Sequence, residues 1–342
     1  MDVQSVNVGF DRNFKGSDIQ GTLVPKAINK NLMTIIYLKA FEDQMKNALR
    51  VAIDYGYRSI DTAYLYTNEV TIGAELENLI KTGKIKREDV FVTSKLPCIA
   101  NRAEDVSRFL KTTLKRLRLD YLDLYLIHHP FGIQNVDDEE LYNFDENGNS
   151  RLDHNTDHES LWKAMEKEVE AGRAKSIGIS NFNSVQIDRL LKTAKIPPAV
   201  NQIEVHCYLT QKPLVDFCKE RKITPVAFSP LGAPFTTEGK SIKPVLLEHP
   251  IVKEIGKKHG KTPGQVLLRF LTQRGIPVIP KSTTPERIRS NFDIQDFTIS
   301  DEDMKKLFGL NKGEEGRTFH YRELFKGCET TRSTPSTSHF KQ

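Results

Sequence analysis

Cysteine is scarce in this sequence, which argues against two classes of small protein: those stabilised by disulfides and those stabilised by zinc. The chain has 342 residues and 4 Cys, with no C-x-x-C spacing among them: Cys98, Cys207, Cys218 and Cys328. A disulfide scaffold or a zinc finger needs more cysteines or closer spacing. We therefore predict a protein of a reducing compartment without a disulfide framework.

Long apolar runs and a charge of one sign are also missing, and we expect no leader segment. No stretch approaches the length that spans a membrane, and the N-terminus has no basic region followed by an apolar run. The 50 Lys and Arg are interspersed with 45 Asp and Glu, so the net charge is +5 without a basic block. We expect a cytoplasmic monomer with no nucleic-acid or membrane partner.

Short apolar or β-branched runs alternate with helical patterns along the chain. The runs are Ser59–Asp61, Phe91–Lys95, Leu122–His128, Ser176–Ser180, Val200–Val205, Thr224–Ser229 and Ile276–Pro280. Between them, residues 44–54 place apolar side chains at helical spacing, and Thr262-Pro263 and Thr284-Pro285 have the composition of helix starts. This alternation predicts an α/β fold with a parallel sheet.

The parallel sheet could be open and doubly wound or closed into a barrel. No G-x-G-x-x-G motif follows any of the runs, which argues against a dinucleotide-binding open sheet. Polar residues gather where the runs end: Asp61, Lys95, His128, Ser180, Asn181, Gln202, Ser229 and Lys281. We predict a single (β/α)8 TIM barrel over residues 24–310. We leave residues 1–23 unplaced and expect residues 311–342 to form a loop over the barrel mouth with a disordered end.

Seven sequence blocks together resemble one enzyme family. They are GYRSIDTAYLYTNE (56–69), SKL (94–96), LDLYLIHHP (122–130), SIGISNFN (176–183), NQIEVHCY (201–208), AFSPLG (227–232) and IPKSTTPERIRSNF (279–292). In this order they resemble the aldo-keto reductase family over about residues 24–297. The resemblance implies a (β/α)8 barrel that reduces aldehydes and ketones with NADPH.

The family's catalytic tetrad corresponds by this resemblance to Asp61, Tyr66, Lys95 and His128. Reduction of a carbonyl needs a proton donor for its oxygen, and a free phenol with a pKa of ~10 is a poor one at neutral pH. A nearby ammonium would lower that pKa. The resemblance makes Tyr66 the donor, with Asp61 holding Lys95 charged and His128 orienting the carbonyl. Taken singly, each of these residues also has an ordinary structural interpretation.

The predicted cofactor site has two ends. By the resemblance, the nicotinamide end takes Ser180, Asn181, Gln202, Phe228, Ser229 and Leu231, with Phe228 stacking on the ring. Turn formation and core hydrogen bonding remain the alternative for Asn181 and Gln202. At the other end, the free N–H groups of the helix starting at Thr284 combine with two cations into an anion site suited to the 2′-phosphate of NADP. Its residues are Lys281, Ser282, Thr283, Thr284 and Arg287, and Asn291 is the family's adenine contact.

The substrate pocket is predicted from three residues: Tyr37, His129 and Phe131. We expect substrate choice to depend on the loop 130–159 and the segment 317–325, and aromatic residues in the loop (Phe131, Tyr142, Phe144) suggest an apolar mouth. We predict no metal site. The glycine-threonine turn that follows the family's first strand is missing after Met33–Ile36.

Two other functions stay open, and the missing turn motivates the first of them. One alternative is a cofactor-binding but weakly active relative with a structural, sensory or regulatory role. Another is a lyase or aldolase that uses Lys95 as a Schiff base, against which the neighbouring Asp61 argues because it keeps the amine charged.

Overall fold

Eight strands form the main sheet, hydrogen-bonded in the order in which they occur in the chain. The computed structural model describes residues 34–36, 42–234, 242 and 244–320. The strands are β1 (Thr34–Ile36), β2 (Ser59–Asp61), β3 (Phe91–Leu96), β4 (Leu124–Ile127), β7 (Ile177–Ser180), β8 (Val200–Glu204), β9 (Thr224–Phe228) and β10 (Val278–Ile279). Each run expected from the sequence overlaps one of these strands.

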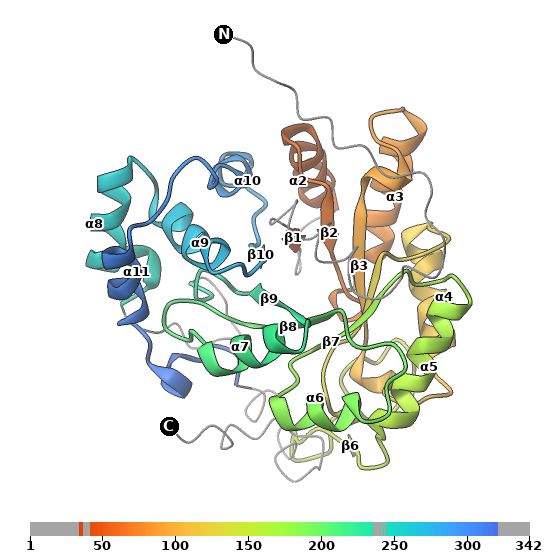
Figure 1. Cartoon of the computed structure of the whole chain (residues 1–342). Helices are drawn as coiled ribbons and strands as arrows, with labels where there is room; N and C mark the ends of the chain where they lie inside the picture. Colours follow the sequence, from red (N-terminus) through yellow and green to blue (C-terminus); the bar gives the residue numbers. More distant parts are fainter. Residues whose placement is uncertain (1–33, 37–41, 235–241, 243, 321–342) are drawn as a thin grey trace.

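The sheet closes into a barrel because β10 lies beside β1 (Figure 1). All the paired neighbours run parallel, so the carboxyl ends of the strands open together at one mouth. The predicted α/β class and (β/α)8 barrel are confirmed. Polar residues that end different strands are therefore brought to the same place.

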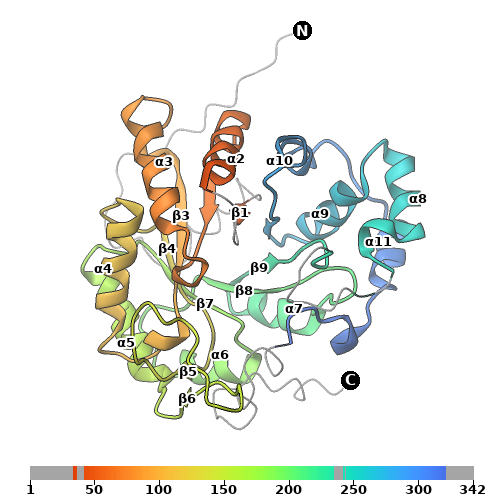
Figure 2. The same cartoon turned by 180° about the vertical axis from the view of Figure 1, so that it is seen from behind.

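Helices surround the strands on the outside (Figures 1 and 2). They are α2 (Glu42–Tyr55), α3 (Glu69–Lys81), α4 (Val106–Leu117), α5 (His158–Glu170), α6 (Ser184–Leu191), α7 (Lys212–Glu220), α8 (Pro250–His259), α9 (Pro263–Gln273), α10 (Pro285–Phe292) and α11 (Asp301–Phe308). Both predicted Thr-Pro helix starts are found, and Thr262 caps α9 reciprocally with Gln265. Among the described residues, we find no helix with the length and apolar character needed to span a bilayer.

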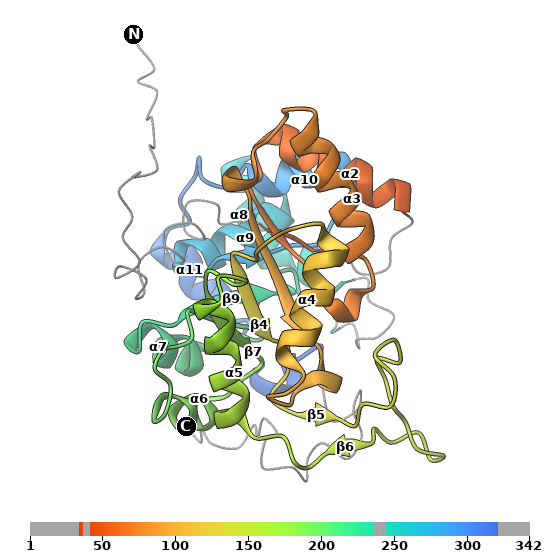
Figure 3. The same cartoon turned by 90° about the vertical axis from the view of Figure 1, so that its right-hand side faces the viewer.

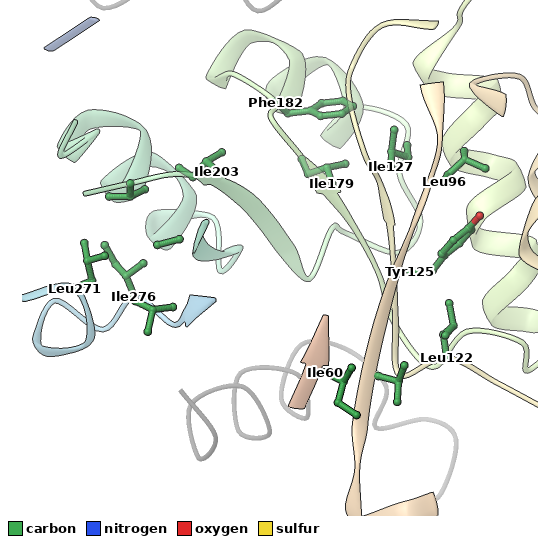
Figure 4. Close-up of a cluster of buried hydrophobic side chains, with 14 of the residues drawn as sticks. Ile60, Leu96, Leu122, Tyr125, Ile127, Ile179, Phe182, Ile203, Leu271 and Ile276 are labelled. Carbon is green, nitrogen blue, oxygen red and sulfur yellow. The ribbon is translucent and has the colours of Figure 1, made fainter. Parts of the chain in front are cut away.

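Alternation along each strand divides the apolar residues into two layers. A small group fills the barrel interior: Leu124, Leu126, Val200, Val226 and Ile279. The residues between them in sequence, such as Tyr125 and Ile127, point outward and pack beneath the helices in a much larger layer, part of which Figure 4 shows. The interior group supports the polar residues at the barrel mouth.

A small hairpin interrupts the regular alternation after β4. Its strands, β5 (Gly132–Ile133) and β6 (Leu152–Asp153), pair antiparallel and lie at the edge of the molecule near α4 and α5 (Figure 3). This hairpin belongs to the loop 130–159, from which the sequence predicts substrate choice.

Several sequence expectations fall on residues outside the described part of the chain. These are the unplaced segment 1–23, Tyr37 with the missing glycine-threonine turn, and the end of the C-terminal tail. The strand that the sequence places at 33–36 is present as β1.

Candidate active site

A buried ion pair lies at the centre of the barrel mouth. Lys95 of β3 pairs with Asp61, the last residue of β2, and their side chains are 0% and 2% exposed. Lys95 Nζ also donates to the backbone oxygen of Thr62 at 2.9 Å, and the second oxygen of Asp61 accepts from Gln202 Nε2 at 2.8 Å. A Schiff-base lysine needs an amine that the substrate can reach, and the Lys95 side chain is fully enclosed.

Tyr66 and His128 complete the group beside this pair. Tyr66 ends a short 3₁₀ helix, η2 (Tyr64–Tyr66), and its half-buried ring has its centroid 5.0 Å from Lys95 Nζ. The ring of His128, which follows β4, meets the Tyr66 ring edge-on at 5.6 Å between centroids. The structure thus brings the four predicted catalytic residues together.

The pKa of the Tyr66 phenol is shifted in the direction opposite to the expected one. Burial raises the pKa of Tyr66 well above its ordinary value of 10.0, and the negative charge of Asp61 raises it further. Burial lowers the pKa of Lys95, while the Asp61 and Glu69 carboxylates oppose that change. The prediction of a lowered phenol pKa is wrong for this structure, because desolvation and the negative charge of Asp61 both raise the pKa of Tyr66. Tyr66 is therefore held in its protonated form, which is the form that donates a proton.

Two neighbouring imidazoles form one wall of the mouth. The rings of His128 and His129 stack at 4.4 Å, and the His129 ring lies 5.3 Å from that of Phe131. Burial lowers the pKa of His128 well below 6.5 and that of His129 to about 3, with the charge of Lys95 contributing to both. Both imidazoles are neutral at neutral pH. A neutral imidazole can donate a hydrogen bond to a carbonyl oxygen.

Side chains that the sequence analysis did not single out fix the backbone of this wall. Asn101 Nδ2 donates to the backbone oxygens of His129 and Phe131 at 2.9 and 2.7 Å, and Cys98 Sγ lies 3.1 Å from His129 Nδ1. Both residues follow β3 closely, Cys98 in the 3₁₀ helix η4 (Cys98–Ala100). In the sequence, their position just after the strand that carries Lys95 is the feature that could have indicated a role at the site.

Hydrogen bonds join three of the residues predicted for the nicotinamide end, Ser180, Asn181 and Gln202. Ser180 Oγ donates to the backbone oxygen of Gln202 at 2.8 Å, and Asn181 Nδ2 donates to the backbone oxygen of His128 at 2.9 Å. Asn181 and Ser229 have positive φ angles of 66° and 48°. Non-glycine residues rarely adopt this conformation, and it is concentrated at functional sites. Phe228 and Leu231 are half-buried beside this group.

The predicted anion site lies at the start of α10. Ser282 Oγ accepts from the backbone N–H of Thr284 at 3.1 Å, which fixes the turn into the helix. Lys281 and Arg287 are exposed on either side of this turn, Thr283 is half-buried and Asn291 is buried. Two cations beside a helix N-terminus match a phosphate monoester, so this donor set fits the 2′-phosphate of NADP.

A cavity beside the loop 130–159 has a polar lining, whereas the sequence suggested an apolar mouth. A cavity of about 440 Å³ is lined by Ile99, Arg102, Asp105, Gln134, Asn135, Val136, Asp137, Asp138 and Asp153. Arg102 and Asp153 form a bidentate ion pair across it. Tyr142 and Phe144 are each 45% exposed and stack on one another, and only Phe131 of the three loop aromatics is buried. None of the four predicted catalytic residues lines this cavity, so we do not assign catalysis to it.

Comparison with known proteins gives consistent matches over most of the chain. The model of the Aldo/keto reductase family matches residues 38–312. Aldo-keto reductase family 1 member A1 of Gallus gallus is 45% identical over 275 residues, which cover 80% of this chain and 83% of that protein. Aldo-keto reductase family 1 member C1 of Macaca fuscata fuscata is 43% identical over 298 residues, covering 85% and 87%. The solved structure of the aldose reductase from Schistosoma japonicum has a TM-score of 0.82 at 39% identity and covers 90% of this chain and 96% of that chain.

Proposed function

The chain belongs to the aldo/keto reductase family and is an oxidoreductase that acts on carbonyl compounds. From this premise we propose that it reduces aldehydes and ketones to alcohols with NADPH, and that Tyr66 donates the proton. The observation that carries the proposal is the meeting of Tyr66, His128 and the buried Lys95–Asp61 pair at one barrel mouth.

The cofactor would be held at the two ends of the predicted site. Ser180, Asn181 and Gln202 offer hydroxyl and amide groups for the nicotinamide carboxamide, with Phe228, Ser229 and Leu231 alongside. Lys281, Ser282, Thr283, Thr284 and Arg287 would hold the 2′-phosphate and Asn291 the adenine. When bound, NADPH supplies the hydride that reduces the carbonyl carbon.

The protein's own residues manage the charge that develops on the carbonyl oxygen. Neutral His128 would donate a hydrogen bond to that oxygen and fix its position. The protonated phenol of Tyr66 would then transfer its proton to the oxygen, so that the product leaves as an alcohol. Lys95, whose Nζ lies 5.0 Å from the centroid of the Tyr66 ring, would offer its positive charge to the phenolate that remains until water reprotonates it. His129 and Phe131 would line the adjoining substrate pocket.

Cofactor preference tests the anion site. We expect wild-type protein to oxidise NADPH with a panel of aldehydes and ketones and to prefer NADPH to NADH. Arg287→Ala should reduce this preference by about 10- to 100-fold, because a hydrogen bond to a charged group contributes ~1.5–3 kcal/mol. Arg289→Ala, on the same helix, is the matched control and should keep the preference. An unchanged NADPH-to-NADH ratio in Arg287→Ala would reject the phosphate assignment, and tight cofactor binding without turnover would favour the weakly active relative.

We also propose that the protein acts as a cytoplasmic monomer. Cys207 and Cys218 are buried and in the thiol form, which is typical of a protein from a reducing compartment. Sedimentation of the purified protein at micromolar concentration tests the oligomeric state, and a dimer would overturn this part of the proposal.

A further inference from the structure

A second buried charge cluster lies at the barrel mouth, on the side away from β3. Its centre is Glu204, the last residue of β8, which is 1% exposed. One carboxylate oxygen accepts from the backbone N–H of Thr318 at 2.8 Å and from its hydroxyl at 2.5 Å, and the other accepts from the backbone N–H of Phe319 at 3.2 Å. His206 Nε2 lies 2.9 Å from the first oxygen. Glu204 therefore holds a segment more than a hundred residues later in the chain.

The direction of the Glu204 side chain follows from strand alternation. Gln202 and Glu204 are two residues apart on β8, so both side chains point to the same face of the strand. Gln202 reaches inward to Asp61. Glu204 thus occupies the inner face one step nearer the mouth, where its register partner on β9 is Phe228.

The segment that Glu204 holds continues to Phe319, which contacts Phe228, the residue predicted to stack on the nicotinamide. Gly316 ends the 3₁₀ helix η6 (Gly313–Gly316) so close to the backbone of Tyr208 that an added Cβ would lie 1.9 Å from the Tyr208 oxygen. Three residues on, the Phe319 ring packs edge-on against Phe228 with centroids 5.5 Å apart. Phe228 packs on the same interior group as Tyr66.

Burying a carboxylate is costly unless hydrogen bonds compensate the lost water, so this arrangement needs its full set of donors. Burial raises the pKa of Glu204, but the donors around it, His206 first, more than offset that effect and leave the pKa below its ordinary value. Glu166 of α5 uses the same device far from the mouth. Its carboxylate accepts from the backbone N–H groups of Lys195 and Ile196 at 2.7 and 2.9 Å.

We propose that Glu204 is a positioning residue for substrate recognition: by holding Thr318 and the backbone of Phe319, it fixes the Phe319 ring against Phe228 as one wall of the carbonyl pocket. The inference rests on the proposed function, since it concerns the pocket of the same reaction. Glu204 does not touch the substrate, and its effect is transmitted through Phe319.

The experiment compares Glu204→Gln with Glu166→Gln in the full-length protein. Activity is measured with a small aldehyde and with a bulky aromatic ketone, and NADPH affinity is measured separately by fluorescence titration. For Glu204→Gln we expect KM for the bulky ketone to rise about five- to thirtyfold, with kcat for the small aldehyde and NADPH affinity unchanged. Glu166→Gln should change neither the KM and kcat values nor the NADPH affinity, even if it lowers the thermal stability of the protein as much as Glu204→Gln does.

A double-mutant cycle with Phe319→Ala separates positioning from general loosening. If Glu204 acts through Phe319, the two substitutions act on the same wall and their effects on KM are not additive. Additive effects, or a Glu204→Gln variant whose KM values match those of Glu166→Gln, would overturn the proposal. Wild-type protein that oxidises no NADPH with any carbonyl would instead contradict the proposed function, so the two failures are distinguishable.

Discussion

The Lys95–Asp61 pair carries two charges in a place that water does not reach, and this makes each partner depend on the other. Breaking a buried pair by neutralising one side leaves an uncompensated charge, which costs about 3–5 kcal/mol. Asp61→Asn should therefore lower the free energy of unfolding by roughly that amount in urea denaturation.

The matched control for this prediction is the exposed pair between Lys84 and Asp54, whose side chains are 52% and 53% exposed. Asp54→Asn should change the free energy of unfolding by less than ~1 kcal/mol. If both substitutions lowered the free energy of unfolding by the same amount, burial would not make the Lys95–Asp61 pair more sensitive than the exposed pair.

At the scale of single residues, the sequence could predict which side chains meet but not how they titrate. Asp61, Lys95 and His128 each end a recognisable strand, so a shared barrel mouth follows from the pattern. The pKa of Tyr66 depends on how much water surrounds its ring and on its distances to Asp61 and Lys95. Those quantities are set by packing, which residue types alone do not specify.

Among the elements, the contact of α3 with α4 offers a sharp test of packing. A Cβ added to Gly73 of α3 would lie 2.3 Å from the backbone oxygen of Arg116 in α4. Backbone cannot move aside as a flexible side chain can, so Gly73→Ala should lower the free energy of unfolding by about 1–3 kcal/mol. In α9, Gly264 has no neighbour nearer than 3.8 Å to an added Cβ.

Gly264→Ala is the control for this packing prediction. Alanine is the better helix former by about 0.5–1 kcal/mol, so this substitution should leave stability unchanged or raise it. Chemical denaturation of both variants provides the comparison, and a Gly73→Ala protein as stable as Gly264→Ala would show that the two helices are not in close backbone contact.

The elements that the sequence predicted are those with a clear local signal. Thr262-Pro263 marks the start of α9 because its cap and proline act within one turn. The α3 helix was not predicted, and it buries Glu69 and Glu75, whose charges obscure an apolar stripe. The pairing of Glu204 with Thr318 joins residues far apart in the sequence, so it follows only from the closed barrel.

For the whole molecule, buried neutral histidines predict a loss of stability in acid. The pKa of His129 is about 3 in the folded protein against an ordinary 6.5, and burial also lowers the pKa values of His128 and His158. Below pH 6.5 the unfolded chain binds protons that the folded chain does not. Stability is therefore complete above that pH and decreases as the pH falls toward 3, by up to ~1.4 kcal/mol per pH unit for each such group.

His129→Gln should reduce the dependence of the free energy of unfolding on pH by the contribution of about one proton. Urea denaturation between pH 6.5 and about 4 measures this dependence. His154→Gln, which removes an exposed imidazole, should leave the slope as it is. A slope that His129→Gln does not change would contradict the burial of a neutral imidazole at the barrel mouth.

The most direct test of the account is the rate of carbonyl reduction by Tyr66→Phe, with NADPH affinity measured on the same protein. Loss of a general acid should lower kcat by about 10²- to 10⁴-fold while NADPH still binds. Tyr64→Phe, which removes the other phenol of η2, where the hydroxyl donates to the backbone oxygen of Asp138, should keep the wild-type rate. A Tyr66→Phe protein that reduces carbonyls as fast as wild type would contradict the assignment of Tyr66 as proton donor.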